Sequence, residues 1–301
     1  GRTSRESKPY FTSGTAAHWT TYTFDALGRV TLVTLPDSST ATNTYNGLTT
    51  TVTNDLSQTT TTVKNARGEI VSVTDNLGSV TTYTYDAFGN NTSITDSEGN
   101  VSTTSYDKAG RKVASYDPDM GHWTYVYDRL GGLVSQTDAK GQTTTVTYDL
   151  LGRPLTRDDG DEISSWVYDT GTKAVGKLTS ATRGQHVQSV EYDSLGRPFR
   201  AHSTLDGVTE TFATTYDASS RVETIQYPSG FTAEYLYNTY GYEYALREQG
   251  ASTHLWTANA RDAELRLLQD TAGNGIVTNR TFDQAQGTID TIHAGTGASV
   301  A

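Results

Sequence analysis

Apolar and polar residues alternate along short stretches of this chain, and each stretch ends in residues that favour turns. From Val80 to Tyr85, the side chains of Tyr83 and Tyr85 fall on one face, and those of Thr82 and Thr84 fall on the other. Successive side chains of a β-strand point to opposite faces, so this alternation predicts a strand. Similar pairs two residues apart recur at Tyr22 and Phe24, Tyr125 and Tyr127, Val146 and Tyr148, Trp166 and Tyr168, Val190 and Tyr192, and Tyr235 and Tyr237. The pattern predicts many strands with an aromatic stripe on one face.

A turn motif, Tyr-Asp-x-x-Gly followed by Arg, Asn or Gly, ends many of these strands. Asp opens a tight turn because its carboxylate accepts hydrogen bonds from backbone N–H groups two residues on, and Gly supplies the positive φ that closes it. The motif residues are Phe24, Asp25, Gly28, Arg29, Tyr85, Asp86, Gly89, Tyr106, Asp107, Gly110, Arg111, Tyr127, Asp128, Gly131, Tyr148, Asp149, Gly152, Arg153, Tyr192, Asp193, Gly196 and Arg197. From Tyr85 to Tyr148 the motif returns every 21 residues, and a fixed period of this length is typical of repeat proteins.

A second turn signal lies between successive motifs, for example at Asp75–Gly78, Asp96–Gly99 and Asp138–Gly141. Each period therefore contains two strands and two turns, which make one β-hairpin. We predict an all-β protein of tandem antiparallel hairpins. Strands twist and large sheets curl, so we expect a curved, spiral sheet in the form of an open shell or partial hollow barrel. Leucine-rich and parallel β-helix solenoids have similar periods, but the hairpin turns disfavour them.

The Tyr-Asp-x-x-Gly-Arg units at 21-residue spacing resemble the YD-repeat, or rearrangement-hotspot (Rhs), family, from about Tyr22 to Gly287. That family includes bacterial polymorphic toxins, the shell subunits of insecticidal toxin complexes, and teneurins. The resemblance implies a long sheet wound into a hollow cocoon, which in many members encloses a toxic C-terminal polypeptide. The self-cleaving aspartate site of the family's C-terminal core has no counterpart here, so we expect a segment of such a wall.

The repeat pattern predicts three segments. We expect a poorly ordered or irregular lead-in over residues 1–20, the repeat sheet over 21–287, and a continuation of the truncated spiral over 288–301. The step between motifs lengthens to 24 residues after Tyr168, so an irregular insertion is expected at about 157–188. The repeats become degenerate after residue 238.

Composition narrows the function classes. Hydrophobic residues make up 34% of the chain, but 19 tyrosines and many Thr and Val residues favour a sheet over disorder. The net charge of −11 disfavours nucleic acid and anionic membranes as partners, and no apolar stretch is long enough to predict membrane insertion. The chain has no cysteine, which excludes disulfides and thiolate metal sites.

The candidate chemistry is sparse. The motif aspartates recur in every repeat, which favours turns over catalytic carboxylates, and the motif arginines are expected to pair with turn carboxylates. A cluster of acidic residues offers a weak candidate metal site, with a solvated turn as the favoured alternative: Asp158, Asp159, Asp161 and Glu162. Four aromatic residues of the stripe form a candidate binding face for sugars or apolar segments, although packing of neighbouring rings against each other is favoured: Tyr83, Tyr125, Trp166 and Tyr235.

These observations, with the resemblance, predict a structural shell segment of a larger secreted or cell-surface bacterial protein of toxin type. We expect it to encapsulate or display another polypeptide, without enzyme activity or a cofactor. The expected partners are other parts of the parent polypeptide or an enclosed cargo, and further copies of the chain through exposed edge strands. The alternative is a carbohydrate- or protein-binding module that uses exposed tyrosine rows.

Overall fold

The computed structural model of the chain describes residues 2–11 and 18–296. Throughout those residues the regular structure is β-strand, which confirms the predicted all-β class. No helix in the described ranges is long and apolar enough to cross a membrane.

The chain divides into two compact units, residues 1–143 with 284–287 and residues 144–283 with 288–301. In the first unit the strands are β1 (Arg5–Ser7), β2 (Trp19–Phe24), β3 (Val30–Thr34), β4 (Thr40–Asn46), β5 (Thr49–Asn54), β6 (Thr59–Lys64), β7 (Ile70–Thr74), β8 (Val80–Tyr85), β9 (Asn91–Thr95), β10 (Val101–Tyr106), β11 (Lys112–Asp117), β12 (Gly121–Tyr127) and β13 (Leu133–Thr137).

The second unit begins at Thr144, within strand β14. Its strands are β14 (Thr143–Tyr148), β15 (Pro154–Asp158), β16 (Ile163–Tyr168), β17 (Leu178–Arg183), β18 (His186–Tyr192), β19 (Pro198–Leu205), β20 (Val208–Tyr216), β21 (Val222–Gln226), β22 (Thr232–Tyr237), β23 (Glu243–Glu248), β24 (His254–Arg261), β25 (Leu267–Ala272), β26 (Ile276–Phe282) and β27 (Ile289–Thr296).

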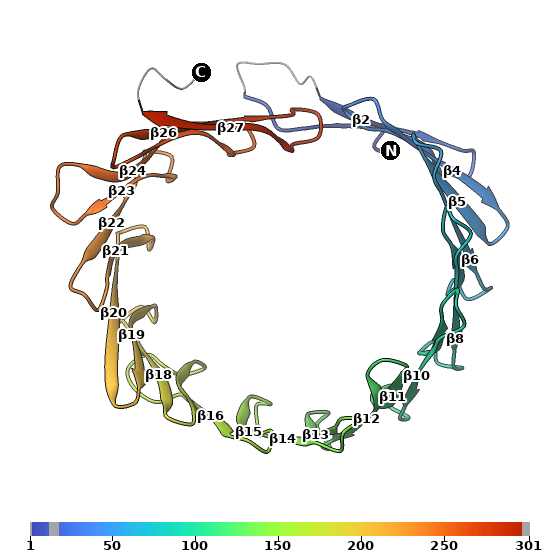
Figure 1. Ribbon diagram of the computed structural model, residues 1–301, viewed down its shortest axis with the longest axis horizontal. Helices are drawn as coiled ribbons and strands as arrows, with labels where there is room; N and C mark the ends of the chain where they lie inside the picture. The colour runs from blue at the N-terminus through green and yellow to red at the C-terminus, as the bar shows by residue number, and fades with distance from the viewer. Residues whose placement is uncertain (1, 12–17, 297–301) are drawn as a thin grey trace. The chain divides into compact units, whose positions relative to one another are not determined.

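Within each unit every strand pairs antiparallel with its neighbours in sequence, so the predicted tandem hairpins are confirmed. Figure 1 shows that the sheet of each unit, taken by itself, curves across successive strands. In the hairpin of β10 and β11, the register shifts by one residue between Ser105 and Tyr106, and Tyr106 lies opposite Lys112. The same shift falls just before the motif aromatic in most repeats, for example before Phe24 and Tyr237. Such a bulge increases the local twist of the strand pair.

The sheet has almost no deep core. Among the described residues, the buried hydrophobic side chains are Ala174, Ala233 and Ala245, and no large side chain is fully buried. In strand β8 the exposed and half-buried positions alternate, with Tyr83 and Tyr85 half-buried. Hydrophobic burial of a conventional core is therefore a small source of stability, and contacts between hairpins must supply much of the rest.

The two lengthened steps have different structural origins. The first is the connection between β16 and β17, which runs from Asp169 to Lys177 in place of a compact motif turn; it lies inside 157–188, and most of the remainder of that range is strand. The second is the long hairpin of β19 and β20, with strands of 8 and 9 residues closed by a tight turn in which Asp206 and Gly207 have positive φ.

The ends of the chain are described in part. Strand β1, inside the predicted lead-in 1–20, pairs with β2 through Glu6 opposite Thr20. Residues 1 and 12–17 of that lead-in lie outside the described residues, as do residues 297–301 of the predicted continuation, whose described part contains β27. The expected lead-in and continuation stay predictions there.

Candidate functional site: the contacts between successive repeats

The motif aspartate holds its own turn together. In the turn after β10, one carboxylate oxygen of Asp107 accepts hydrogen bonds from the backbone N–H groups of Ala109 and Arg111, each at 2.9 Å. The other oxygen accepts one from Arg111 Nε at 2.7 Å, and Gly110 closes the turn with φ of +77°. The backbone N–H of Arg111, followed by its guanidinium, lowers the pKa of Asp107. A carboxylate stabilised in its charged form by these donors suits a structural role.

The motif tyrosine joins one repeat to the repeat before it. The Tyr106 hydroxyl donates a hydrogen bond to the carbonyl oxygen of Asn91 at 2.9 Å, and Asn91 lies opposite Tyr85 at the bulge of the preceding hairpin. The same bond links Tyr45 to Val30 (2.8 Å), Tyr85 to Ile70 (2.7 Å), Tyr127 to Lys112 (2.8 Å), Tyr192 to Leu178 (2.6 Å), Tyr216 to Pro198 (2.6 Å) and Tyr237 to Val222 (2.8 Å). Each phenol thus pairs a carbonyl at the bulge, where the regular ladder is interrupted.

The motif arginine joins one repeat to the repeat after it. Arg153 binds Asp149 of its own turn through Nε at 2.7 Å and binds both carboxylate oxygens of Asp169 in the next repeat at 3.0 and 2.6 Å. Its guanidinium lies 4.4 Å from the ring centroid of Tyr168. The side-chain hydrogen bond from Arg153, followed by the Gly176 N–H, lowers the pKa of Asp169 to about 2. A planar guanidinium is suited to this task because it stacks on a ring and forks to carboxylates at the same time.

The stacking recurs along both units. Guanidinium groups lie over the next motif ring for Arg29 and Tyr45 (4.2 Å), Arg111 and Tyr127 (4.9 Å), Arg197 and Tyr216 (4.2 Å), Arg221 and Tyr237 (4.2 Å), and Arg266 and Phe282 (4.6 Å). We call the tyrosine hydroxyl bond and the guanidinium stack together the inter-repeat clamp. The observed ring partner of these motif aromatics is a guanidinium.

Repeats that depart from the motif keep some of its contacts through other residues. Asn90 stands where Arg is usual, and its amide donates to Asp86 at 2.9 Å. Lys177, at the end of the long connection, places its ammonium 4.6 Å from the ring of Tyr192 and donates to the Gly196 carbonyl. The motif alone did not identify Lys177, because the insertion separates it from its aspartate.

The four residues of the candidate aromatic face are all half-buried. Lys112 lies 4.9 Å from the ring of Tyr125, and the hydroxyl of Ser115 is 3.4 Å from that of Tyr125. Burial, more than the nearby Tyr227 and Glu243, raises the pKa of Tyr235. Tyr83 and Trp166 lie opposite Ile94 and Ala181 on their partner strands. Tyr83 and Tyr125 belong to the first unit, and Trp166 and Tyr235 belong to the second.

The acidic cluster Asp158, Asp159, Asp161 and Glu162 lies at the turn between β15 and β16, facing arginines. Arg183 pairs with Asp159 at 3.3 Å and with Glu162 at 3.4 Å, and Arg157 lies 3.9 Å from Asp159. Among the residues that the structure describes, no three acidic or histidine side chains group in a way that holds a metal ion. The geometry is that of a charged turn.

Fold and contacts together define an all-β protein of tandem hairpins in which most hairpins are clamped to the next by their motif residues. Two stretches of the chain, residues 65–99 and 123–162, match the family model described as RHS Repeat. No curated protein matches the chain by sequence.

Solved structures with the same fold are Tc toxin assemblies. The crystal structure of TcdB2-TccC3 without its hypervariable C-terminal region superimposes with a TM-score of 0.82 at 16% identity. A Photorhabdus luminescens Tc holotoxin pore gives a TM-score of 0.81, also at 16% identity. Both cover 94% of this chain, and this chain spans only 17% of the length of either. TcdB2-TccC3-Cdc42 gives a TM-score of 0.80 at 17% identity, over 92% of this chain and 17% of that one.

The two matched stretches, residues 65–99 and 123–162, are similar to the repeats of the Rhs, or YD-repeat, family, which the motif spacing predicted. The likeness to the Tc structures is one of fold.

Proposed function

We propose that this chain is a structural wall segment of a larger toxin-type protein, and that the wall surrounds another polypeptide. The observation that carries the proposal is the inter-repeat clamp, because it uses the motif Tyr and Arg to join hairpins. The fold shared with Tc toxin assemblies supports the toxin-type setting. Repeats that contact only their neighbours can build a wall of any length by addition.

The same contacts support a chain without catalytic turnover of its own. Catalytic carboxylate pairs need environments that separate their pKa values. Asp25, Asp107, Asp149 and Asp193 instead share one environment, in which the backbone N–H of the turn arginine lowers each pKa. The alternative function, a binding module built on tyrosine rows, has less support because guanidinium groups occupy ring faces of many motif tyrosines.

The proposed partners are the other parts of the parent polypeptide and its enclosed cargo, in a secreted or cell-surface protein. Self-association is proposed through strand β27, which pairs with β26 and is mostly exposed, with Ile289 and Ile292 at 52% and 57% exposure. Exposed strands with apolar side chains are ready templates for pairing with a further strand. Size exclusion with light scattering should detect dimers that Ile292→Lys dissociates, whereas a strict monomer would refute this part.

Limited proteolysis of the full parent chain tests enclosure. If the wall surrounds another segment, that segment resists protease until urea opens the wall, and then both are cut together. A parent carrying Tyr85→Ala and Tyr106→Ala, which remove two adjacent inter-repeat hydroxyl bonds, should release the segment at lower urea. Phe88→Ala, at an 82% exposed turn position, is the matched control and should leave the protection unchanged. Rapid cleavage of every segment outside the repeats in native buffer would overturn the proposal.

A further inference from the structure

The long connection Asp169–Lys177 is held in a defined course. Asp169 has a φ of +65°, and its carboxylate is fixed by Arg153 and by the Gly176 N–H at 2.6 Å. Halfway along, Ala174 is only 1% exposed. A loop that is anchored at its start and buried at its centre is part of the rigid structure.

Four further hydrogen bonds fasten the connection in place. The hydroxyls of Thr170 and Thr179 are 2.6 Å apart, and Thr179 donates to the Val167 carbonyl at 3.0 Å. At the far end, Lys177 donates to the carbonyls of Gly196 and Lys173. The connection is therefore bound both to its own hairpin and to the next motif turn.

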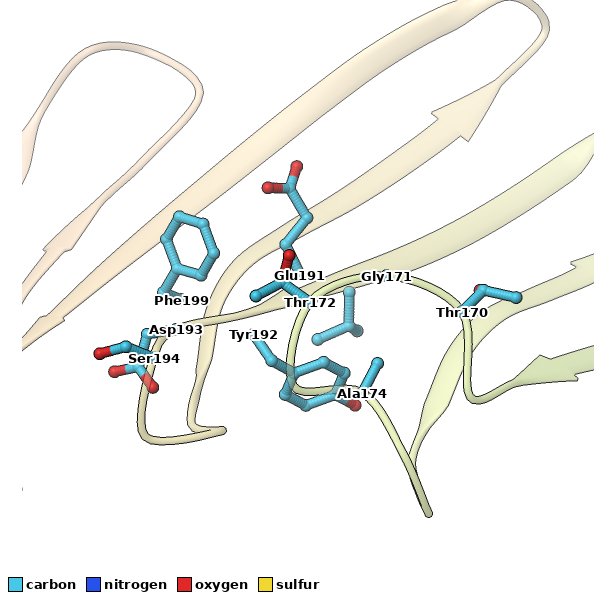
Figure 2. A pocket seen from close by; sticks show the side chains of 10 residues that line it. Thr170, Gly171, Thr172, Ala174, Glu191, Tyr192, Asp193, Ser194 and Phe199 are labelled. Carbon is cyan, nitrogen blue, oxygen red and sulfur yellow. The ribbon is translucent and has the colours of Figure 1, made fainter.

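This arrangement forms one side of a half-open cavity of about 480 Å³ between the connection, strand β18 and the motif turn that follows it. Figure 2 shows Phe199 and Glu191 above the backbone of Gly171 and Thr172, and the ring of Tyr192 with Ala174 below it. The volume is within the usual range for small-molecule sites. Among the described motif turns, the chain expands only this one into a long connection. The cavity is therefore formed once and not in every repeat.

The lining combines an aromatic ring with polar groups that retain hydrogen-bonding capacity. Among the described contacts, the hydroxyls of Thr172 and Ser194 have no protein partner. One oxygen of Glu191 binds His202 Nε2 at 2.9 Å, while the other lies 3.8 Å from Arg200, too far for a hydrogen bond. That oxygen is left as an acceptor for hydroxyl groups of a ligand. The guanidinium of Arg200 also lies 5.2 Å from the ring centroid of Phe199.

The charged groups of the lining are already paired within the protein. Asp193 binds Arg197 at 2.7 Å, Glu191 binds His202, and the nearby ammonium of Lys177 donates to two carbonyls. Neutral ligands with several hydroxyls and an apolar ring face match an aromatic side chain beside carboxylate and hydroxyl acceptors. We propose that this cavity binds one ring of a neutral sugar, with Phe199 against the ring face, and with Glu191 and Thr172 at its hydroxyls. The site is independent of the enclosure proposed above.

Saturation-transfer NMR and calorimetry of the whole chain with glucose, galactose, mannose and N-acetylglucosamine test the site. At least one sugar should bind with roughly millimolar affinity, as expected for a single ring in a half-open cavity. Glu191→Gln should weaken that binding about tenfold because it replaces a charged acceptor with a neutral amide. The matched control is Glu223→Gln, at an exposed glutamate of strand β21, which should bind as the unaltered chain does.

Two further variants separate the site from a folding effect. Phe199→Ala should abolish saturation transfer while the far-ultraviolet circular dichroism is unchanged. Replacing residues 169–177 with the turn sequence of residues 193–197 restores a regular repeat, and this variant should fold and bind no sugar. Absence of binding by all four sugars refutes the proposal, as does sugar binding that survives the loop replacement. Binding of hydroxyl-rich peptides in place of sugars would also refute it.

Discussion

Replacing Tyr237 with Phe isolates the hydroxyl bond of one clamp. The Tyr237 hydroxyl donates to the Val222 carbonyl at 2.8 Å, and Arg221 stacks on the same ring at 4.2 Å. Phenylalanine keeps the ring and hence the stacking, so the substitution removes only the bond between the hairpin of β22 and β23 and the hairpin before it. If the clamp joins hairpins as described, these two hairpins separate more easily in the variant.

The magnitude follows from the geometry of that bond. A typical intramolecular hydrogen bond contributes about 1 kcal/mol net to stability. The Tyr237 ring is half-buried and the bond is short, so a loss of about 1–1.5 kcal/mol is expected, or roughly a five- to tenfold larger population of the opened state. Because repeats interact with their nearest neighbours, the effect should be confined to the strands on either side.

Hydrogen exchange measured by mass spectrometry resolves this effect by segment. Peptides from β21 and β22 should exchange roughly five- to tenfold faster in Tyr237→Phe, and those from β14 and β15 should not change. The matched control is Tyr240→Phe, because Tyr240 is 84% exposed at the adjacent turn. Equal exchange in the two variants would refute the view that the phenol holds neighbouring hairpins together, and acceleration spread over the whole unit would refute nearest-neighbour coupling.

Three more predictions concern single groups. The pKa of Asp169 is about 2, below its usual 3.8, so its ion pair stabilises the fold above pH 3.8, and this stability is lost as the pH falls toward 2. Asp169→Asn should flatten this part of an acid titration followed by circular dichroism. An unchanged titration profile would contradict the prediction. Burial raises the pKa of Tyr216 above 10, so stability present below pH 10 is lost as pH rises further, and Tyr216→Phe should show a shallower alkaline loss in urea titrations. Gly152 has φ of +78°, and nothing beyond its chain neighbours lies within 4 Å of the place that an alanine methyl group would take. Gly152→Ala should therefore cost about 1 kcal/mol in urea unfolding from backbone strain alone, and a neutral result would argue against that turn geometry.

The sequence allowed the strands, the hairpins and the turns to be predicted, because each depends on residues close together in the chain. Alternation places Tyr83 and Tyr85 on one face, and Asp with Gly encodes the turn wherever the motif recurs. The pairing of a motif arginine with its turn carboxylate is local as well, as in Arg111 and Asp107. These features need no knowledge of which strands lie side by side.

The clamp could not be predicted in the same way, because it depends on lateral register between repeats. The Tyr106 hydroxyl reaches the carbonyl of a residue 15 positions earlier, and a period does not show which carbonyl a bulge leaves open. The sequence did contain a pattern that indicates the guanidinium stack. An arginine directly follows the motif glycine in several repeats, and an aromatic residue occupies the motif position of the next repeat. The cavity beneath 169–177 was also beyond prediction, because the course of that connection depends on Arg153 from another hairpin.

The clamp explains how a chain with so few buried apolar side chains forms an extended sheet. A single β-hairpin is only marginally stable in water, and the hairpins of this chain gain little stability from a buried core. The tyrosine of a hairpin bonds backward to the preceding bulge, while its arginine stacks forward on the following ring, so an interior repeat is held by two neighbours. A repeat with a weak element, such as Asn90 in place of arginine, keeps the backward tyrosine bond of Tyr85. Two neighbouring hairpins are thus joined both by a tyrosine bond that reaches backward and by an arginine that reaches forward. When one of the two contacts is missing, the other still joins the hairpins, so single departures from the motif are tolerated.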